Sequence, residues 1–322
     1  MQQWSSPSAT PSQLRPCVAT FGNFDGVHRG HRAILDELVR QGHERGLPAV
    51  AVTFDPHPVE VMHPERAPAI ISPGPLRDDL LSEAGVAGLL VLSYTMEFAQ
   101  TSAVDYIVDT FVEGLQCSVL VVGADTKGFG AGYTGDVDLL RELGAEHGFE
   151  VVVIEDQGDD ERWSSSAVRT HLSVGEVAEA SVILDRPHRV VGTVVHGFHR
   201  GRELGYPTAN LGMDSLGLVP ADGVYAGWLV RLDLPEDSAD RRLPAAISIG
   251  TNPTFDQQVR VVESYVLDRT DLDLYGERVA VDFVEHVRPT LKFDSIDELL
   301  VAMARDVELT RTFLGLPPTA RP

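Results

Sequence analysis

The sequence predicts two domains, an α/β domain with a parallel sheet followed by an antiparallel β-barrel with a terminal helix. The length of 322 residues favours two domains rather than one. In the first half, short apolar runs alternate with amphipathic helical stretches, which is typical of a parallel sheet covered on both faces. In the second half this alternation stops, and five or six strands separated by turns indicate a small barrel.

The composition is that of a globular protein, with 43% hydrophobic and 23% charged residues. The net charge of −22 argues against nucleic acid as a partner, because a phosphate backbone requires a basic surface, whereas a nucleotide requires only a basic pocket. The two cysteines, Cys17 and Cys117, lack metal-ligand or redox spacing and favour a reducing compartment. Since no apolar run approaches the ~20 residues that span a bilayer, we expect a cytoplasmic protein without a membrane partner. The oligomeric state does not follow from the sequence.

The order of the predicted elements sets the expected domain boundaries. Residues 1–16 are rich in Ser, Pro and Gln, so we expect a disordered tail. The α/β domain is expected at 17–184, with strands at 18–21, 49–54, 88–92, 119–122 and 151–154. A linker is expected at 185–188 and the barrel at 189–322, with strands at 189–195, 224–232, 245–249, 259–267 and 278–285. Ser295 is expected to cap the final helix.

Two histidines lie in the turn between the first predicted strand and the first predicted helix. Gly22 and Asp25 belong to this turn, and the helix is expected to begin near Gly30. His28 and His31 therefore lie near a helix N-terminus, where backbone N–H groups and the helix dipole favour phosphate. The alternative is a solvated turn that happens to hold two histidines. The order of strand, glycines and helix favours the phosphate site.

A second candidate phosphate site lies near the end of the α/β domain. Three serines, Ser164, Ser165 and Ser166, precede Arg169 at the start of a predicted helix. Their hydroxyls, the free N–H groups and the guanidinium suit a phosphate. Alone, the segment is better interpreted as a helix N-cap, and only its pairing with the histidine turn favours the phosphate site. Asp125 follows the fourth strand and is expected at the same sheet edge as the histidines, because parallel strands end at one edge.

The spacing His28-x-Gly30-His31 resembles the signature of the nucleotidyltransferase superfamily. Together with the serine segment and F-D-P-H-P at 54–58, it resembles the adenylyltransferase module of bacterial FAD synthetases. The resemblance implies a Rossmann-like nucleotidyltransferase domain. It also implies that the histidines stabilise the triphosphate of ATP as pyrophosphate leaves, that the serine segment cradles ATP phosphates, and that the phosphate of FMN attacks the α-phosphorus.

One loop departs from the family pattern. The pattern after the fourth strand is Gly-x-Asn/Asp-aromatic-x-Phe-Gly, whereas here Thr126 follows Asp125 and one residue is inserted before Phe129. Loss of an aromatic contact surface and the added glycines predict a weakened affinity for FMN or ATP, without loss of FAD synthesis.

The second half contains a segment rich in glycine and arginine, at 199–210. Arg200, Gly201 and Arg202 suit a loop that encloses phosphates. Thr208 and Asn210 offer hard oxygen ligands two residues apart, compatible with Mg²⁺. The alternative for these two residues is a polar turn after a proline.

Glu263 is the candidate catalytic base of the second half. Alternation places it on one strand face with Val259, Val261, Tyr265 and Leu267. A carboxylate on such a face is costly unless it is paired or functional, and burial makes it a better base for a hydroxyl proton. The alternative is a glutamate at the rim of the barrel that is paired with Arg260 or Arg278.

The segments at 201–210, 223–226, 250–255 and 273–276 resemble those of bacterial riboflavin kinase. The resemblance implies that Thr208 and Asn210 bind Mg·ATP and that Glu263 is the base on the 5′-hydroxyl of riboflavin. Over about residues 17–314 the chain resembles bifunctional riboflavin kinase/FAD synthetase, with ATP, riboflavin and FMN as substrates and FAD as a product.

Two other interpretations remain open at this point. The first is a riboflavin kinase whose N-terminal domain is catalytically weak or inactive. The second is a flavin-binding regulator, which the set of Thr208, Asn210 and Glu263 disfavours because binding alone needs no base.

Overall fold

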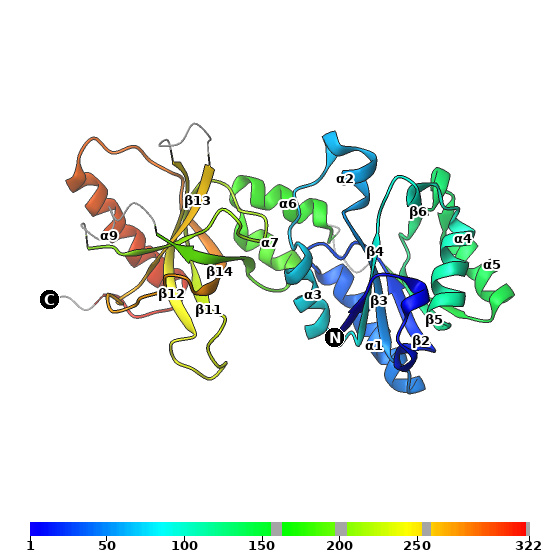
Figure 1. The fold of residues 1–322 in the computed structure, drawn as a ribbon. Helices are drawn as coiled ribbons and strands as arrows, with labels where there is room; N and C mark the ends of the chain where they lie inside the picture. The colour runs from blue at the N-terminus through cyan, green and yellow to red at the C-terminus, as the bar shows by residue number, and fades with distance from the viewer. Residues whose placement is uncertain (156–162, 197–204, 253–258, 320–322) are drawn as a thin grey trace. The chain divides into compact units, whose positions relative to one another are not determined.

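The computed structural model describes residues 1–155, 163–196, 205–252 and 259–319. The chain divides into two compact units, Met1–Ser165 and Ser166–Pro322. The fold of each unit is shown in Figure 1.

The first unit is built on a six-stranded sheet in which all neighbouring strands are parallel. The strand order is β1-β4-β3-β2-β5-β8. The strands are β1 (Gln2–Trp4), β2 (Cys17–Phe21), β3 (Ala49–Asp55), β4 (Gly88–Ser93), β5 (Cys117–Gly123) and β8 (Glu150–Ile154). All but β1 lie where continuous apolar runs predicted them, because strands covered on both faces have no polar side. The predicted parallel architecture is confirmed.

Helices cover both faces of this sheet (Figure 1). They are α1 (Arg29–Arg45), α3 (Gly74–Glu83), α4 (Ala103–Ile107), its π-helical continuation Val108–Gly114, and α5 (Val137–His147). The short helix α2 (Pro58–Met62) follows β3 and buries no residue. One core, which includes Leu35 and Leu81, lies under α1 and α3. The other, which includes Ile107 and Leu140, lies under α4 and α5. A short antiparallel pair, β6 (Lys127–Phe129) and β7 (Gly135–Asp136), follows β5.

The strand order reverses beside β2. The chain runs from β2 to β3 and β4 on one side, and then adds β5 and β8 on the other. Open α/β sheets bind ligands beyond the carboxyl ends of the strands at such a point. Because β2 and β5 are neighbours, the turn with His28 and His31 and the turn with Asp125 emerge side by side.

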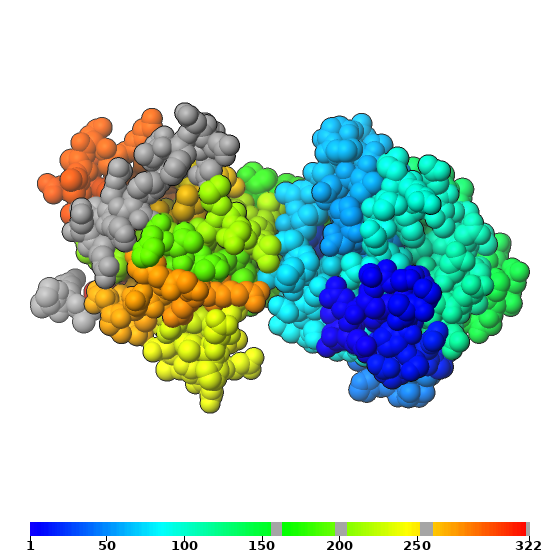
Figure 2. All heavy atoms as spheres, in the orientation of Figure 1, coloured from blue at the N-terminus to red at the C-terminus, as the bar shows by residue number. Residues whose placement is uncertain are grey.

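The expected disordered tail at residues 1–16 is wrong. Residues Gln2–Trp4 form β1, which pairs in parallel with β4, and Leu14 is buried. A Cβ atom at Gly88 would lie 2.7 Å from the Leu14 side chain and 2.9 Å from Trp4, so a glycine makes room for both anchors. Figure 2 shows the dark blue N-terminal residues lying against the surface of the first unit. Because residues 1–16 are mostly polar, their composition did not indicate that Trp4 and Leu14 pack against Gly88.

The second unit contains a closed antiparallel barrel, as predicted. Its strand order is β10-β13-β12-β11-β14-β9. The strands are β9 (His188–Val195), β10 (Thr208–Leu211), β11 (Gly223–Arg231), β12 (Arg242–Asn252), β13 (Val259–Val266) and β14 (Arg278–Arg288). The helices are α6 (Ser165–Val174), α7 (Val177–Leu184) and α9 (Ile296–Phe313), and the side chain of Ser295 caps α9 as predicted.

The boundary between the units differs from the expected linker at 185–188. The units divide between Ser165 and Ser166, so α7 belongs to the second unit. Ile183 and Leu184 are buried, and α7 contacts β9 and β14. The polar segment at 185–188 therefore connects α7 directly to β9 within one unit.

Candidate active sites

The turn after β2 places two imidazole rings at the N-terminus of α1. His28 is the N-cap residue, and its Nδ1 accepts a hydrogen bond from the backbone N–H of His31 at 3.4 Å. The two rings are stacked, with centroids 3.8 Å apart. Both rings line one cavity, so they present imidazole to a ligand at a helix N-terminus, where anions are favoured.

His31 is held in its neutral form. Burial and the neighbouring His28 lower the pKa of His31 well below its usual value. Its Nδ1 atom is buried and has no hydrogen-bond partner in the described part of the chain. A neutral imidazole that lacks a partner is ready to donate to a ligand, and the negative charge of a triphosphate would raise its pKa on binding.

The backbone of the same turn is strained. Phe24 and Val27 adopt φ values of 50° and 40°, in the region that favours glycine, and both side chains are buried. At Gly30 a Cβ atom would lie 3.2 Å from the His28 ring and 3.4 Å from the carbonyl oxygen of Trp163. Such strain concentrates at functional sites. Burial of the two side chains and the absence of a side chain at Gly30 hold the stacked histidines in place.

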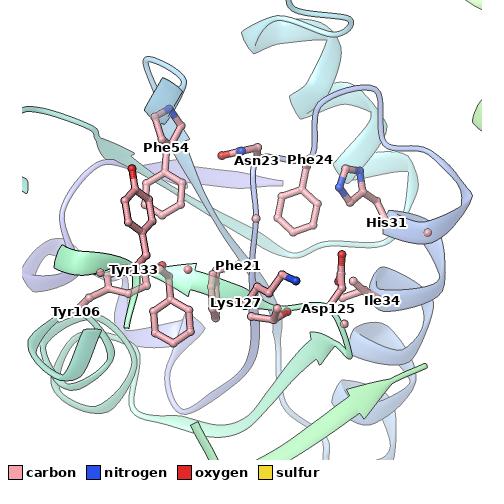
Figure 3. Close-up of a pocket in the computed structure, with 18 of the residues that line it drawn as sticks. Phe21, Asn23, Phe24, His31, Ile34, Phe54, Tyr106, Asp125, Lys127 and Tyr133 are labelled. Carbon is pink, nitrogen blue, oxygen red and sulfur yellow. The ribbon is translucent and has the colours of Figure 1, made fainter. Parts of the chain in front are cut away.

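The histidines form one end of a cavity of about 490 Å³ (Figure 3). Gly22, Gly30, Asp125 and Ser164 also line it, and their contact with a nucleotide stays a prediction. The opposite wall is aromatic and consists of Phe21, Phe54, Tyr94, Phe98, Tyr106, Phe129 and Tyr133. The cavity therefore joins an anion-binding end to an aromatic end.

Asp25 is a supporting residue rather than part of the cavity wall. Its buried carboxylate accepts hydrogen bonds from the backbone N–H groups of Ile71 at 3.2 Å and Ser72 at 2.9 Å. Its carbonyl oxygen accepts a hydrogen bond from the Ser165 hydroxyl at 2.8 Å. This geometry disfavours the expected direct contact between Asp25 and a nucleotide. The Asp25 carboxylate instead links its own turn to the segment at Ile71 and Ser72.

Replacing Asp25 with Ala is expected to lower the free energy of unfolding by ~2–4 kcal/mol, because two buried N–H groups lose a charged acceptor. Asp25→Asn keeps one acceptor oxygen and should lose less. Urea denaturation measures both, with the exposed Asp36→Ala on α1 as the control. A loss below ~0.5 kcal/mol in Asp25→Ala would contradict the supporting role.

The other predicted phosphate residues of this segment lie at the start of α6. Ser165 begins the helix, and Ser166 and Arg169 follow in its first turns, within the second unit. Their contact with a phosphate stays a prediction.

The second unit brings together the three predicted kinase residues. Asn210 on β10 lies directly opposite Glu263 on β13. Asn210 Nδ2 donates to the carbonyl and hydroxyl oxygens of Thr208, both at 3.3 Å. Thr208 also hydrogen bonds to the Glu263 carboxylate. Thr208 begins strand β10, so the segment is a strand rather than the alternative polar turn.

Thr208 lies between two cavities of the second unit. One cavity, of about 230 Å³, is lined by Thr208 and Asn210. The other, of about 300 Å³, is lined by Thr208 and Glu263 and is bounded by α9 residues such as Met303. A group bound in the first cavity and a group bound in the second would therefore meet at Thr208.

Burial raises the pKa of Glu263, and the Thr208 hydrogen bond opposes this shift. The alternative pairing with Arg260 is not formed, because Arg260 Nε donates to Asp222 at 2.7 Å. Glu263 is half-buried, as the apolar residues beside it on the strand predicted. Val262, Ser264 and Val266 form the more deeply buried face of β13, and Glu263 faces the cavity beside α9.

The comparisons with known proteins cover both units. The FAD synthetase family model matches residues 10–168, and the riboflavin kinase family model matches residues 184–314. The bifunctional riboflavin kinase/FMN adenylyltransferase of Escherichia coli (strain K12) is 38% identical, covering 94% of this chain and 95% of that protein. The chain belongs to the bifunctional riboflavin kinase/FMN adenylyltransferase family. Both family models match, which favours two activities over a chain with one inactive domain.

Further matches also extend over nearly the whole chain. The bifunctional riboflavin kinase/FMN adenylyltransferase of Pseudomonas fluorescens is 36% identical, over 95% of this chain and 96% of that protein. A crystal structure described as a macrolide-efflux protein from Streptococcus pneumoniae is 28% identical and superposes with a TM-score of 0.82, covering 96% of this chain and 98% of that one. Among the described residues, no helix is long and apolar enough to cross a membrane.

Some family positions lie outside the described residues. Arg200, Gly201 and Arg202 are among them, as are residues 253–255 of the segment at 250–255. Their roles stay predictions.

The aromatic wall of the first cavity was not predictable from the sequence. Phe54, Tyr94, Phe98 and Tyr106 come from separate elements, and each reads locally as an ordinary core residue. Only the F-D-P-H-P segment at 54–58 pointed to this region, because Phe54 belongs to it.

Proposed function

We propose that the second unit phosphorylates riboflavin to FMN with ATP, and that the first unit transfers AMP from a second ATP to FMN, giving FAD and pyrophosphate. Each reaction is assigned to the unit whose sequence matches the corresponding family model. Because both reactions consume ATP, we place the protein in the cytoplasm, as a bifunctional enzyme of FAD biosynthesis.

In the adenylyltransferase site, a phosphate oxygen of FMN attacks the α-phosphorus of ATP. The bond between the α-phosphorus and the bridging oxygen breaks, and pyrophosphate leaves. His28, His31 and the N–H groups at the start of α1 stabilise the negative charge that develops on the departing pyrophosphate. The observation that carries this assignment is the stacked histidine pair at one end of the cavity.

The aromatic wall of the same cavity suits the flavin ring. Phe54 packs on Tyr94 and Tyr106, with ring centroids 5.6 Å and 6.1 Å apart, and Tyr94 packs on Phe98 at 5.5 Å. An extended, preformed aromatic cluster offers faces and edges to a flat conjugated ring at low ordering cost. In this proposal the flavin ring occupies the aromatic end and the triphosphate of ATP the histidine end.

In the kinase site, the 5′-hydroxyl of riboflavin attacks the γ-phosphorus of ATP, the bond between that phosphorus and the β,γ-bridging oxygen breaks, and ADP leaves. Glu263 takes the hydroxyl proton, and its raised pKa makes it a stronger base than an exposed glutamate. ATP occupies the cavity beside Asn210 and riboflavin the cavity beside Glu263, so the γ-phosphate and the hydroxyl meet at Thr208. The observation that carries this assignment is the shared position of Thr208.

Thr208 and Asn210 also fit a Mg²⁺ ion bound with ATP. The Thr208 hydroxyl and the Asn210 amide oxygen are hard donors on one cavity wall, and Mg²⁺ in nucleotide sites takes few protein ligands beside phosphates and water. Magnesium would neutralise phosphate charge during transfer. In the described part of the chain, no group of three His, Cys, Asp or Glu side chains is arranged to hold a metal without a nucleotide.

One assay tests both assignments. Purified protein is incubated with riboflavin, ATP and Mg²⁺, and the flavins are separated by chromatography over time. We expect FMN to appear first and FAD to follow. If FMN accumulates and no FAD forms at saturating ATP, the first unit is not an adenylyltransferase. If riboflavin is unchanged, the kinase assignment is wrong.

A further inference from the structure

Lys127 is a residue type that is rare in this chain, and it lines the cavity of the first unit. Of the 26 basic side chains, 24 are arginines, and Lys127 and Lys292 are the two lysines. Lys127 lies in the loop that departs from the family pattern. None of the roles assigned above uses it.

The charge balance of the cavity makes this lysine important. The described titratable residues around it include His28, His31, Asp125 and Glu155. Burial and His28 lower the pKa of His31 well below its usual value, so this ring does not supply a positive charge. Among the described lining residues, Lys127 alone carries a permanent positive charge, in a chain with a net charge of −22. A site for two phosphate-bearing substrates needs such a charge.

The position of Lys127 is fixed by the backbone around it. It pairs with Asp136 in the β6–β7 ladder. Phe129, two residues further on, packs on Phe21 with ring centroids 5.4 Å apart, and Lys127, Phe129 and Phe21 all line the cavity. At Gly130 a Cβ atom would lie 2.4 Å from the backbone of Ala103, so the loop is seated closely on the start of α4.

The amine of Lys127 lies between the two ends of the cavity. Figure 3 shows it between the aromatic side chains that include Phe21 and Tyr133 and the polar side that holds His31 and Asp125. Its amine makes no ion pair or hydrogen bond with another described residue.

We propose that Lys127 binds the 5′-phosphate of FMN and thereby selects FMN over riboflavin in the first unit. This inference rests on the proposed adenylyltransferase function. With the flavin ring at the aromatic end, the phosphate of FMN reaches the middle of the cavity, next to the α-phosphate of ATP. The ammonium group holds the attacking phosphate there and reduces its repulsion by ATP. Riboflavin has a neutral hydroxyl at this position and gains nothing from the charge.

The kinetic test compares Lys127→Met with Lys127→Arg and the control Lys292→Met. In Lys127→Met the KM for FMN in FAD synthesis should rise about ten- to a hundredfold, as for loss of a hydrogen bond to a charged group. The KM for ATP should change less than about threefold. Lys127→Arg should recover part of the affinity, and Lys292→Met should behave as the wild type. An unchanged KM for FMN, or a rise confined to the KM for ATP, overturns the proposal.

A second measurement uses the wild-type protein and so does not depend on the folding of a variant. The sequence contains two lysines, Lys127 and Lys292. Trace acetylation with peptide mass spectrometry, scaled to an added reference peptide, gives the reactivity of each lysine with and without each flavin. FMN should protect Lys127 and riboflavin should not. Equal protection by the two flavins, or protection by ATP alone, contradicts the proposal.

The same experiments separate this inference from the proposed function. If the wild type makes FAD but Lys127→Met has normal kinetics, only the role of Lys127 fails. If the wild type makes no FAD, the adenylyltransferase function fails, and the protection pattern still decides whether Lys127 binds the phosphate of FMN.

Discussion

Glu263→Gln is expected to lower the rate of FMN formation about 10²–10⁴-fold, the usual loss for a general base. Glutamine keeps the size and the hydrogen bonding of the side chain but cannot take the proton of the riboflavin hydroxyl. Conversion of supplied FMN to FAD should be unchanged, because Glu263 belongs to the second unit and the histidine pair to the first. Separate assays with riboflavin and with FMN measure the two activities.

The pH profile provides a second check on Glu263. Because burial raises its pKa, the carboxylate becomes protonated at a higher pH than an exposed glutamate. Kinase kcat/KM should therefore fall as the pH falls through this raised pKa, and Glu263→Gln should lack that acidic limb. Glu285→Gln changes another partly exposed glutamate of the barrel and serves as the matched control. Near-normal kinase activity in Glu263→Gln would remove Glu263 from the catalytic role.

His31→Ala is expected to lower the rate of FAD formation about 10²–10³-fold, the loss typical of removing one donor to a developing negative charge. FMN formation should continue at the wild-type rate. His28 also caps α1, so His28→Asn is a better variant than His28→Ala, because asparagine keeps an N-cap acceptor while removing the ring. Its loss of FAD formation should be similar.

His43→Ala is the matched control for the histidine variants. His43 is exposed near the other end of α1, where it cannot reach the cavity. It should retain both activities. Normal FAD formation in His31→Ala would show that the histidine motif has only a structural role. Equal losses of both activities would instead indicate a folding defect.

Hydrophobic periodicity was sufficient to predict the two architectures. The strands from β2 to β5 are continuous apolar runs bounded by turns, and α1 has its apolar face at helical spacing. The partial burial of Glu263 was predictable from the apolar residues beside it, but the sequence does not reveal that α9 and a cavity cover this face of β13. The anchoring of Trp4 and Leu14 was missed because it depends on space left by the distant Gly88.

The residues of the sites were predictable where a local rule applied. His28 and His31 follow a strand and begin a helix, and Asp125 follows the neighbouring strand of the same edge. Asp25 was predicted to bind a nucleotide because its actual partners are distant in the sequence. The backbone N–H groups of Ile71 and Ser72 donate to its carboxylate.

The structure of the loop after β5, which departs from the family pattern at Thr126, was also only partly predictable. The glycines after Thr126 suggested a loose loop. In the structure Gly130 instead allows close packing on Ala103, and a Cβ atom at Gly135 would lie 2.4 Å from the Phe129 ring. The expected weakening of substrate affinity stays a prediction, and the KM values of the wild type for FMN and ATP test it.

The central claim is that one chain carries two independent active sites that act in sequence. The most direct test mixes the variants Glu263→Gln and His31→Ala with riboflavin, ATP and Mg²⁺. Each variant alone should form little FAD, because the first makes almost no FMN and the second converts almost none. The mixture should restore FAD formation, with FMN released by one protein and used by the other. A mixture that forms no more FAD than the variants do separately, or either variant making FAD from riboflavin at the wild-type rate, would contradict the claim.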